Sequence, residues 1–377
     1  MLNVLFSLCI LWLLGCSPQE VPEVKPLASV EAPSYTRYSK GFRIDTVTGF
    51  KILSITNPWA GHVLTQRILL VDSLPKGVMG KIPDSLQALP RLKIPLRRIV
   101  ALSSTHLALL ADLQALDRVV GVSRHDLIIS PTTRENMARR KVPQVGYGPS
   151  IQVEQVLELE PDAVFTFGTG DSKFDDYSVL QEAHLPVLVL SEWLESHPLG
   201  RLEWIRLLGI LLKQENLADS IFLDRANRYD SLLRIAHKLP DLPTVMTGLP
   251  QGETWYMTGG RNYFAQFLRD AKAKYYWNEN LSQGSLKSSV EQVLATAQHA
   301  DYWLNPGTWN TRAEALAEDP RVMLFDSWKK GQVYQHNKSD FWELGMTRPD
   351  LVLADLIAIF HPNSLPAYPT TFYQLLQ

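Results

Sequence analysis

Residues 98–106 read Arg-Ile-Val-Ala-Leu-Ser-Ser-Thr-His and decide the fold class. The run from Ile99 to Leu102 is continuously apolar, which is typical of a strand buried on both faces of a parallel sheet. The hydroxyl residues that follow are good helix caps, and the apolar spacing predicts a helix over 106–116. A strand, a cap and a helix in this order form the first half of a βαβ unit.

The same pattern continues along the chain. Short apolar strands are predicted at 118–122, 162–167 and 187–190, separated by helical or loop segments, so we predict an N-terminal α/β lobe over 96–195. The ligand crevice of such a sheet lies outside the carboxyl ends of its strands. Those ends carry Ser103-Ser104-Thr105-His106, Ser123-Arg124-His125, Gly168-Thr169-Gly170-Asp171 and Ser191-Glu192-Trp193.

A long helical pattern follows this lobe. Apolar residues recur at helical spacing from Leu199 to Lys238, between Pro198 and Pro240. We predict one linking helix within 196–239, roughly 50 Å long at about 1.5 Å per residue. A second α/β lobe is then expected over 240–377, with strands at 244–249 and 301–304 and helices at 262–271, 289–297 and 348–360.

An internal repeat connects the two lobes. Val-Glu-Gln-Val-Leu stands at 153–157 and again at 290–294, and the strand that follows each copy has the same offset of 137 residues. The simplest interpretation is two equivalent lobes, each with one glutamate, Glu154 or Glu291, at the start of an equivalent helix. The alternative is that both glutamates only interact favourably with a helix N-terminal dipole.

The first 33 residues are different in kind. Leu2 to Leu14 is apolar but too short for a spanning helix, which predicts a signal peptide over 1–15. The Leu-Leu-Gly-Cys ending resembles a bacterial lipoprotein signal, which implies lipidation of Cys16. Four prolines in 16–33 predict an extended tether, so the folded part is expected beside a membrane in the bacterial cell envelope, on its periplasmic side.

Alternating residues after Gly41 predict a small N-terminal β appendage over 34–95. Strands are expected near 42–46, 50–53 and 67–71. Two interpretations are open: the appendage covers one flank of the protein, or it forms a lid or partner surface.

Composition limits the possible partners. The 377 residues contain 37 Lys+Arg and 39 Asp+Glu, a net charge of -2, which argues against a nucleic-acid partner. Both cysteines lie in the first sixteen residues, so neither a disulfide framework nor a zinc cluster is expected. The sequence has no two histidines at the i, i+4 spacing that binds a bare metal ion on a helix.

Taken together, an ordered series of segments between about residues 95 and 362 resembles the iron-siderophore and vitamin B12 class, class III, of periplasmic substrate-binding proteins. These segments are Arg98–Leu110, Arg118–Val122, Val145–Tyr147, Val153–Asp162 and Arg348–Asp355 with His361-Pro362. The resemblance implies two Rossmann-like lobes joined by one long helix, a metal chelate held between them, and delivery to the permease of an ABC importer. It places Glu154 and Glu291 at the two permease-docking positions.

The ligand predicted from this resemblance is a ferric siderophore, with no resident cofactor. Such a ligand needs aromatic walls and a few cations. The candidates are Tyr147, Trp193, Trp255 and Trp309 for walls, and Arg124, Arg261 and Arg348 for charge.

Cobalamin and haem are the alternative ligands. Cobalamin-binding members carry tryptophans six residues before each docking glutamate, where this chain has Gly148 and Ser285. Haem iron needs a coordinating side chain, for which His106, His125, His336 and Tyr147 are candidates.

Other classes of protein fit less well. The sequence has no G-x-S-x-G, H-E-x-x-H or P-loop motif, so we expect a monomeric binding protein and not an enzyme. A chelatase-like enzyme shares the two-lobed shape, but a secretion signal argues against it. A purely adhesive lipoprotein leaves the paired glutamates unexplained.

Overall fold

The computed structural model describes residues 35–56, 65–73, 82–168, 177–307, 309–336 and 341–377. The predicted signal peptide, the tether and the lipidation site Cys16 lie outside the described residues. Among the helices of the described ranges, none has the length and apolarity needed to cross a bilayer.

The N-terminal lobe contains the predicted parallel sheet, with strands in the order β6-β5-β7-β8. Both faces are buried: Val164 packs against the helices α3 and α5, while Phe165 packs on the opposite face with α1. Continuous apolar strands are the consequence of this two-sided burial. The elements are β5 (Ile99–Ala101), α1 (Ser104–Asp112), β6 (Val119–Val122), α2 (Pro131–Arg139), α3 (Val153–Glu158), β7 (Ala163–Thr166), α5 (Ser178–Glu182) and β8 (Val187–Val189).

The C-terminal lobe repeats this topology. Its main sheet has the order β12-β9-β14-β15-β16, in which the first four strands are parallel and β16 is antiparallel. In both lobes the order is therefore second, first, third, fourth in chain order. The main strands are β9 (Thr244–Thr247), β12 (Lys274–Tyr275), β14 (Tyr302–Leu304), β15 (Val333–His336) and β16 (Tyr373–Leu375).

A second, antiparallel sheet and six helices complete this lobe. The sheet consists of β10 (Leu249–Gln251), β11 (Thr254–Thr258) and β13 (Ser285–Ser289). The helices are α8 (Tyr263–Asp270), α9 (Val290–Ala297), α10 (Arg312–Glu318), α11 (Asp326–Lys329), α12 (Leu344–Thr347) and α13 (Pro349–Phe360).

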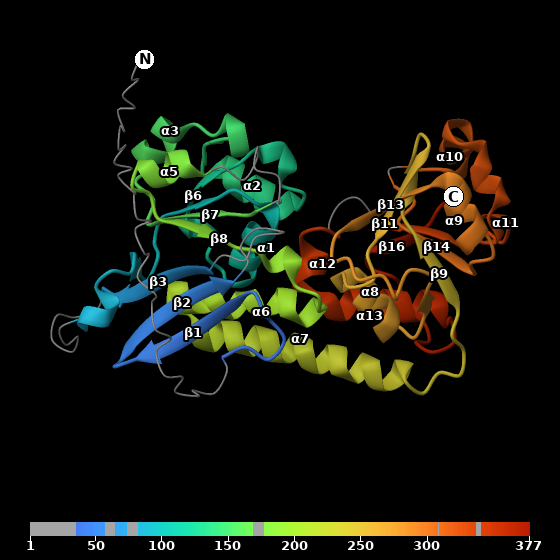
Figure 1. The fold of residues 1–377 in the computed structure, drawn as a ribbon, viewed down its shortest axis with the longest axis horizontal. Coiled ribbons are helices and arrows are strands. Elements are labelled where there is room, and N and C mark those ends of the chain that lie inside the picture. Colours follow the sequence, from blue (N-terminus) through green and yellow to red (C-terminus); the bar gives the residue numbers. More distant parts are fainter. Residues whose placement is uncertain (1–34, 57–64, 74–81, 169–176, 308, 337–340) are drawn as a thin grey trace, which may run out of the picture. The chain divides into compact units, whose positions relative to one another are not determined.

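Two helices, and not one, occupy the predicted linking segment. Lys213 adopts a left-handed conformation (φ 58°) and ends α6 (Pro198–Leu212), after which the chain turns into α7 (Glu215–Ala236). The helices pack side by side (Figure 1), and Gly209 allows this, because a Cβ there would lie 2.5 Å from the Cβ of Ala218. The expectation of one uninterrupted helix from Leu199 to Lys238 was therefore wrong, because the chain turns at Lys213.

The linking role belongs to α7, which is about 33 Å long at about 1.5 Å per residue. It packs on α6 and on α13 of the C-terminal lobe. Its Arg225 binds the carboxylate of Asp112 in α1 and the carbonyl of Thr347, 2.8 Å away at the end of α12. One guanidinium thus joins an element of each lobe.

The N-terminal strands form a separate four-stranded sheet (blue in Figure 1). The strands are β1 (Phe42–Val47), β2 (Phe50–Thr56), β3 (Thr65–Asp72) and β4 (Arg91–Ile94). The side chain of Gln66 donates to the carbonyl of Val187 (2.6 Å) and accepts from the amide of Val189 (3.3 Å). Both partners belong to β8, the last strand of the neighbouring sheet, so the appendage covers this edge.

Residues 37–41, the N-terminal strap, are fastened to α6 by two buried carboxylates. Glu203 accepts the main-chain N–H groups of residues 37–39 at 2.7–2.8 Å. Glu195, which directly precedes α6, accepts those of residues 40 and 41 and the indole N–H of Trp204. Five consecutive N–H groups therefore bind two side chains, which satisfies the charge of both buried carboxylates.

Candidate functional site

The two glutamates of the internal repeat occupy equivalent places. Glu154 lies in the first turn of α3, which leads into β7, and Glu291 lies in the first turn of α9, which leads into β14. Strands β7 and β14 are both third in their lobes and both adjoin the first strand. Both glutamates are exposed. The fold therefore presents two solvent-accessible carboxylates at equivalent positions, one on each lobe.

The surroundings of the two carboxylates differ. Arg321 Nη1 lies 3.5 Å from Glu291 Oε1, and the same guanidinium binds Asp319 (2.9 Å) and Glu253 (2.8 Å). The Glu291 backbone N–H, the Ser289 hydroxyl and Arg321 together hold the pKa of Glu291 below its usual value. In the described residues, no ion pair is formed by Glu154.

Polar side chains gather at the carboxyl ends of β5 and β8, as predicted. Thr105 Oγ1 donates to Glu192 Oε1 (2.7 Å), and His106 Nε2 lies 3.6 Å from Glu192 Oε2. His106 and Glu192 are buried, and the positive charge of the buried Arg201 in α6 helps to lower the pKa of Glu192. The guanidinium of Arg201 lies 4.1 Å from the ring centroid of Tyr263, a residue of the opposite lobe. This polar cluster therefore lies beside the contact between the lobes.

The predicted ligand residues of the segment after β6 are accessible. Arg124 is exposed and forms a bidentate ion pair with Asp126. Tyr147 is partly buried, close enough for its hydroxyl to act electrostatically on Arg124. The main-chain N–H of Gly146 donates to the carbonyl of Ser123 (3.0 Å), so the next residues, Tyr147 and Arg124, lie on the same edge of the N-terminal lobe.

Trp193 is also partly accessible. It follows Glu192 at the carboxyl end of β8. Its indole nitrogen is buried and has no hydrogen-bond partner among the described residues. Trp193 stays a ligand candidate because part of its ring is accessible at this edge of the sheet.

Two predicted aromatic walls are core residues instead. Trp255 is 1% exposed, packs against Trp303 at 5.2 Å between ring centroids, and donates its indole N–H to the carbonyl of Thr247 (3.0 Å). Trp309 is 4% exposed and donates to Glu318 Oε2 (2.7 Å). The prediction that these two tryptophans contact a ligand was wrong, because their surfaces and their N–H groups are already used inside the lobe.

The side chains of the two remaining predicted arginines have different surroundings. Arg261 is exposed at the end of the turn that precedes α8, and its main-chain N–H donates to Ser282. Arg348 is held by Asp350 in a bidentate ion pair with distances of 2.9 and 2.7 Å. Arg348 therefore organises the start of α13, whereas Arg261 presents its side chain to solvent.

The histidines proposed as haem ligands are all in contact with other side chains or the main chain. His106 faces Glu192, the Nε2 of His125 lies 2.8 Å from the carbonyl of Val142, and His336 stacks on Phe341 with centroids 4.7 Å apart. In the part of the chain that the structure describes, no group of three His, Cys, Asp or Glu side chains is arranged to hold a metal ion.

A direct contact between the lobes follows β15. The buried carboxylate of Glu343 accepts the main-chain N–H groups of Ile129 and Ser130, which immediately precede α2 in the N-terminal lobe. The preceding residue, Trp342, is exposed. Neither Trp342 nor Glu343 stands in a recognisable sequence motif, so neither could be predicted as a site residue.

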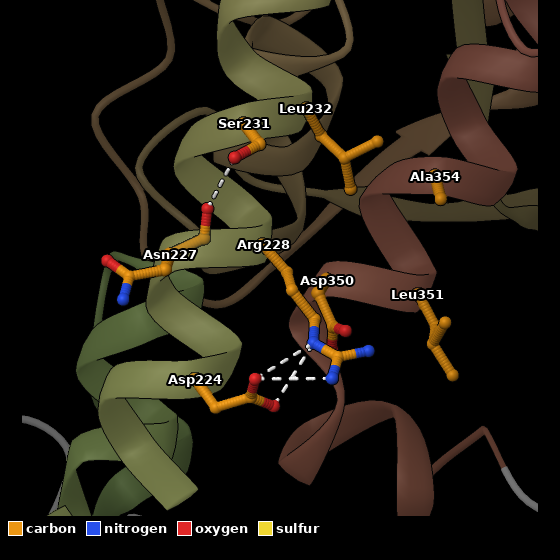
Figure 2. A pocket seen from close by; sticks show the side chains of 8 residues that line it. All are labelled: Asp224, Asn227, Arg228, Ser231, Leu232, Asp350, Leu351 and Ala354. Atoms are coloured by element: carbon orange, nitrogen blue, oxygen red, sulfur yellow. Dashed lines mark hydrogen bonds and ion pairs between the residues drawn. The ribbon is translucent and has the colours of Figure 1, made fainter. Parts of the chain in front are cut away.

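An open groove lies elsewhere, between α7 and α13. Its volume is about 430 Å³, and Figure 2 shows the ion pair of Arg228 and Asp224 at one end. It lies on the linking helix, away from the carboxyl ends of the strands, and it is open and shallow. We therefore do not regard it as the ligand site. Its lining residues are Asp224, Asn227, Arg228, Ser231, Leu232, Asp350, Leu351 and Ala354.

Comparison with known proteins identifies the class. The family model described as periplasmic binding protein matches residues 99–339, which is more than half of the chain. The chain therefore belongs to the periplasmic binding protein family.

Individual relatives are distant. An uncharacterised lipoprotein of Methanocaldococcus jannaschii is 24% identical over 313 residues, covering 80% of this chain and 73% of the relative. A periplasmic haem-binding protein of Pseudomonas aeruginosa has a TM-score of 0.57 at 21% identity, covering 75% of this chain and 98% of its own. A periplasmic binding protein of Veillonella parvula has a TM-score of 0.58 at 14% identity, covering 86% and 99%. At these identities the structures share the fold alone.

Proposed function

We propose that this protein is the substrate-binding component of an ABC importer and that it delivers a metal chelate to the permease. The observation that carries this proposal is the pair of exposed carboxylates, Glu154 and Glu291, at equivalent positions on two lobes of the same topology. Two separated charges fix the register of a partner that carries arginines, and exposed pairs form and dissociate quickly.

The proposed cargo is a ferric siderophore, bound at the edge where the lobes meet. Support comes from Arg124 and Tyr147 on the same edge of the N-terminal lobe and from the partly accessible Trp193 at the carboxyl end of β8. Solved proteins of the same fold are named as a possible iron-binding protein, a haem-binding protein and a nickel-bound protein. Haem and cobalamin stay as alternative cargoes of the same importer class.

We also propose that the chain is anchored by a lipid at Cys16. The M. jannaschii relative, which is named a lipoprotein, supports this. Replacing Cys16 by Ser is expected to release the protein from the membrane fraction, as measured by fractionation. Membrane retention of that variant contradicts the anchor and leaves the binding role untouched.

The central experiment compares two double variants. Glu154→Ala with Glu291→Ala is expected to keep chelate affinity within about twofold and to reduce uptake at least tenfold, because the docking charges are lost while the cleft is unchanged. The control is Glu135→Ala with Glu279→Ala, which removes one exposed glutamate from each lobe at other positions. Equal uptake by both double variants contradicts the docking role.

Stoichiometry separates this function from a chelatase-like enzyme. A binding protein releases its chelate unchanged, at one chelate per chain. Mass spectrometry of the chelate after prolonged incubation is the measurement, and conversion of more than one equivalent contradicts a pure binding role.

A further inference from the structure

Trp342 is the one exposed tryptophan in the described residues. Half of its surface (50%) faces solvent, whereas five of the others are at most 5% exposed and Trp193 and Trp277 are partly buried. An indole is among the most expensive side chains to leave in water. Its exposure in a protein that buries most of its tryptophans calls for a partner.

The indole of Trp342 is held in position by its neighbours. Its ring packs edge-on against His336, with centroids 5.4 Å apart, and against Phe341 at 5.3 Å. Phe341 is itself buried and packs against Phe372 and Tyr373. An aromatic ring that is ordered before binding loses little entropy when a ligand covers it.

The position of Trp342 is the edge where the lobes meet. It follows β15, at the carboxyl end of the sheet, where α/β proteins bind ligands. The next residue, Glu343, binds the main chain of residues 129 and 130 in the opposite lobe. That segment of the opposite lobe also carries the exposed side chains of Leu127 and Arg124. Apolar surface from both lobes therefore flanks one contact.

We propose that Trp342 is a cargo-binding residue that stacks on a flat, ring-bearing face of the chelate, such as a catecholate ring or a porphyrin. The inference rests on the proposed function and deepens it, because it favours ring-bearing chelates over purely aliphatic ones. An exposed, fixed indole offers a π-face of large area, which a planar ring covers better than a flexible chain.

The test uses three probes: a ferric tris-catecholate, haemin, and a ferric tris-hydroxamate without rings. Trp342→Ala is expected to weaken binding of the better-bound ring-bearing probe about tenfold or more, whereas Trp342→Phe retains most of the affinity. Binding of the tris-hydroxamate is expected to be weak and to change less than twofold. The control is Met323→Ala, which removes an equally exposed apolar side chain (49%) from η6 (Pro320–Leu324).

A second readout does not depend on affinity. Iodide is expected to quench an exposed component of tryptophan fluorescence in the free protein, and the better-bound ring-bearing probe is expected to protect it. That protected component is expected to be smaller in Trp342→Phe. Unchanged affinity of Trp342→Ala for every probe that the wild type binds overturns this inference alone. Failure of the wild type to bind any probe overturns the proposed cargo as well.

Discussion

The two lobes have the same strand order but different interiors. The core of the N-terminal sheet facing α3 and α5 is mainly aliphatic, with valines such as Val100, Val164 and Val187 and one aromatic residue, Tyr177. The corresponding core of the C-terminal lobe contains Trp255, Trp303, Trp309, Phe325 and Trp328. The same strand order is therefore compatible with two different sets of core residues.

The aromatic core also needs polar partners that an aliphatic core does not. Trp303 donates its indole N–H to the carbonyl of Gly248 (2.8 Å) and has its ring centroid within 6.4 Å of four other aromatic rings. Each buried indole must find such an acceptor. The indole hydrogen bonds of Trp303 and Trp255 thus fix these rings relative to the main chain, whereas valine side chains only fill volume.

The largest expected difference between the lobes is in stability. Trp303→Ala is expected to lower the free energy of unfolding by about 3–5 kcal/mol, because it leaves a large cavity and an unpaired carbonyl. Val164→Ala, the matched change in the N-terminal lobe, is expected to cost about 2 kcal/mol. Chemical denaturation of both variants checks this. Equal losses in the free energy of unfolding contradict the view that the two cores contribute differently to stability.

A second expected difference concerns acid. Burial raises the pKa of Glu192, but the nearby positive charges of His106 and Arg201 and the hydrogen bond from Thr105 more than offset it, so the pKa lies below the usual 4.5. Because the folded-state pKa is depressed, this stabilisation is present above pH 4.5 and is lost as the pH falls below it.

Glu192→Gln tests this. The variant is expected to lose about 3 kcal/mol at neutral pH, because the buried positive charge of Arg201 then lacks a nearby compensating negative charge, and to depend less on pH below 4.5. Denaturation at pH 7 and at pH 4 measures both effects. An acid dependence identical to the wild type contradicts a depressed pKa at Glu192.

The smallest expected difference distinguishes the two docking carboxylates. Glu291 forms an ion pair with Arg321, whereas Glu154 forms none in the described residues. Arg321→Gln is expected to strengthen binding to the permease by less than about 1 kcal/mol, because Glu291 is then free for a permease arginine. Binding to the permease in nanodiscs at low and moderate salt is the measurement. Weaker binding means instead that Arg321 positions Glu291 for docking.

Much of the fold could be predicted from the sequence, because burial on two faces leaves a continuous apolar run, as at 99–102. The equivalence of Glu154 and Glu291 was readable for the same reason: a repeat of pattern and offset survives divergence of the core. The break between α6 and α7 was not readable, because Lys213 in a left-handed conformation leaves no Gly or Pro signal.

The candidate site was harder to predict. Trp255 and Trp309 were mistaken for ligand residues, because the sequence does not reveal whether an indole faces a core or a cleft. Trp342 could not be predicted, because its place at the contact between the lobes is seen only once Glu343 meets residues 129 and 130, more than two hundred positions away in the chain. Such contacts are properties of the folded chain and not of any local pattern.

The strap at residues 37–41 has a mechanical consequence. Any pull transmitted along the chain from its N-terminal side reaches five hydrogen bonds to Glu195 and Glu203 before it reaches either sheet. Glu195 precedes α6 and Glu203 lies within it. The force therefore acts on the hairpin of α6 and α7, and not on the edge where cargo is proposed to bind. An N-terminal attachment at this point therefore holds the protein without pulling the two lobes apart.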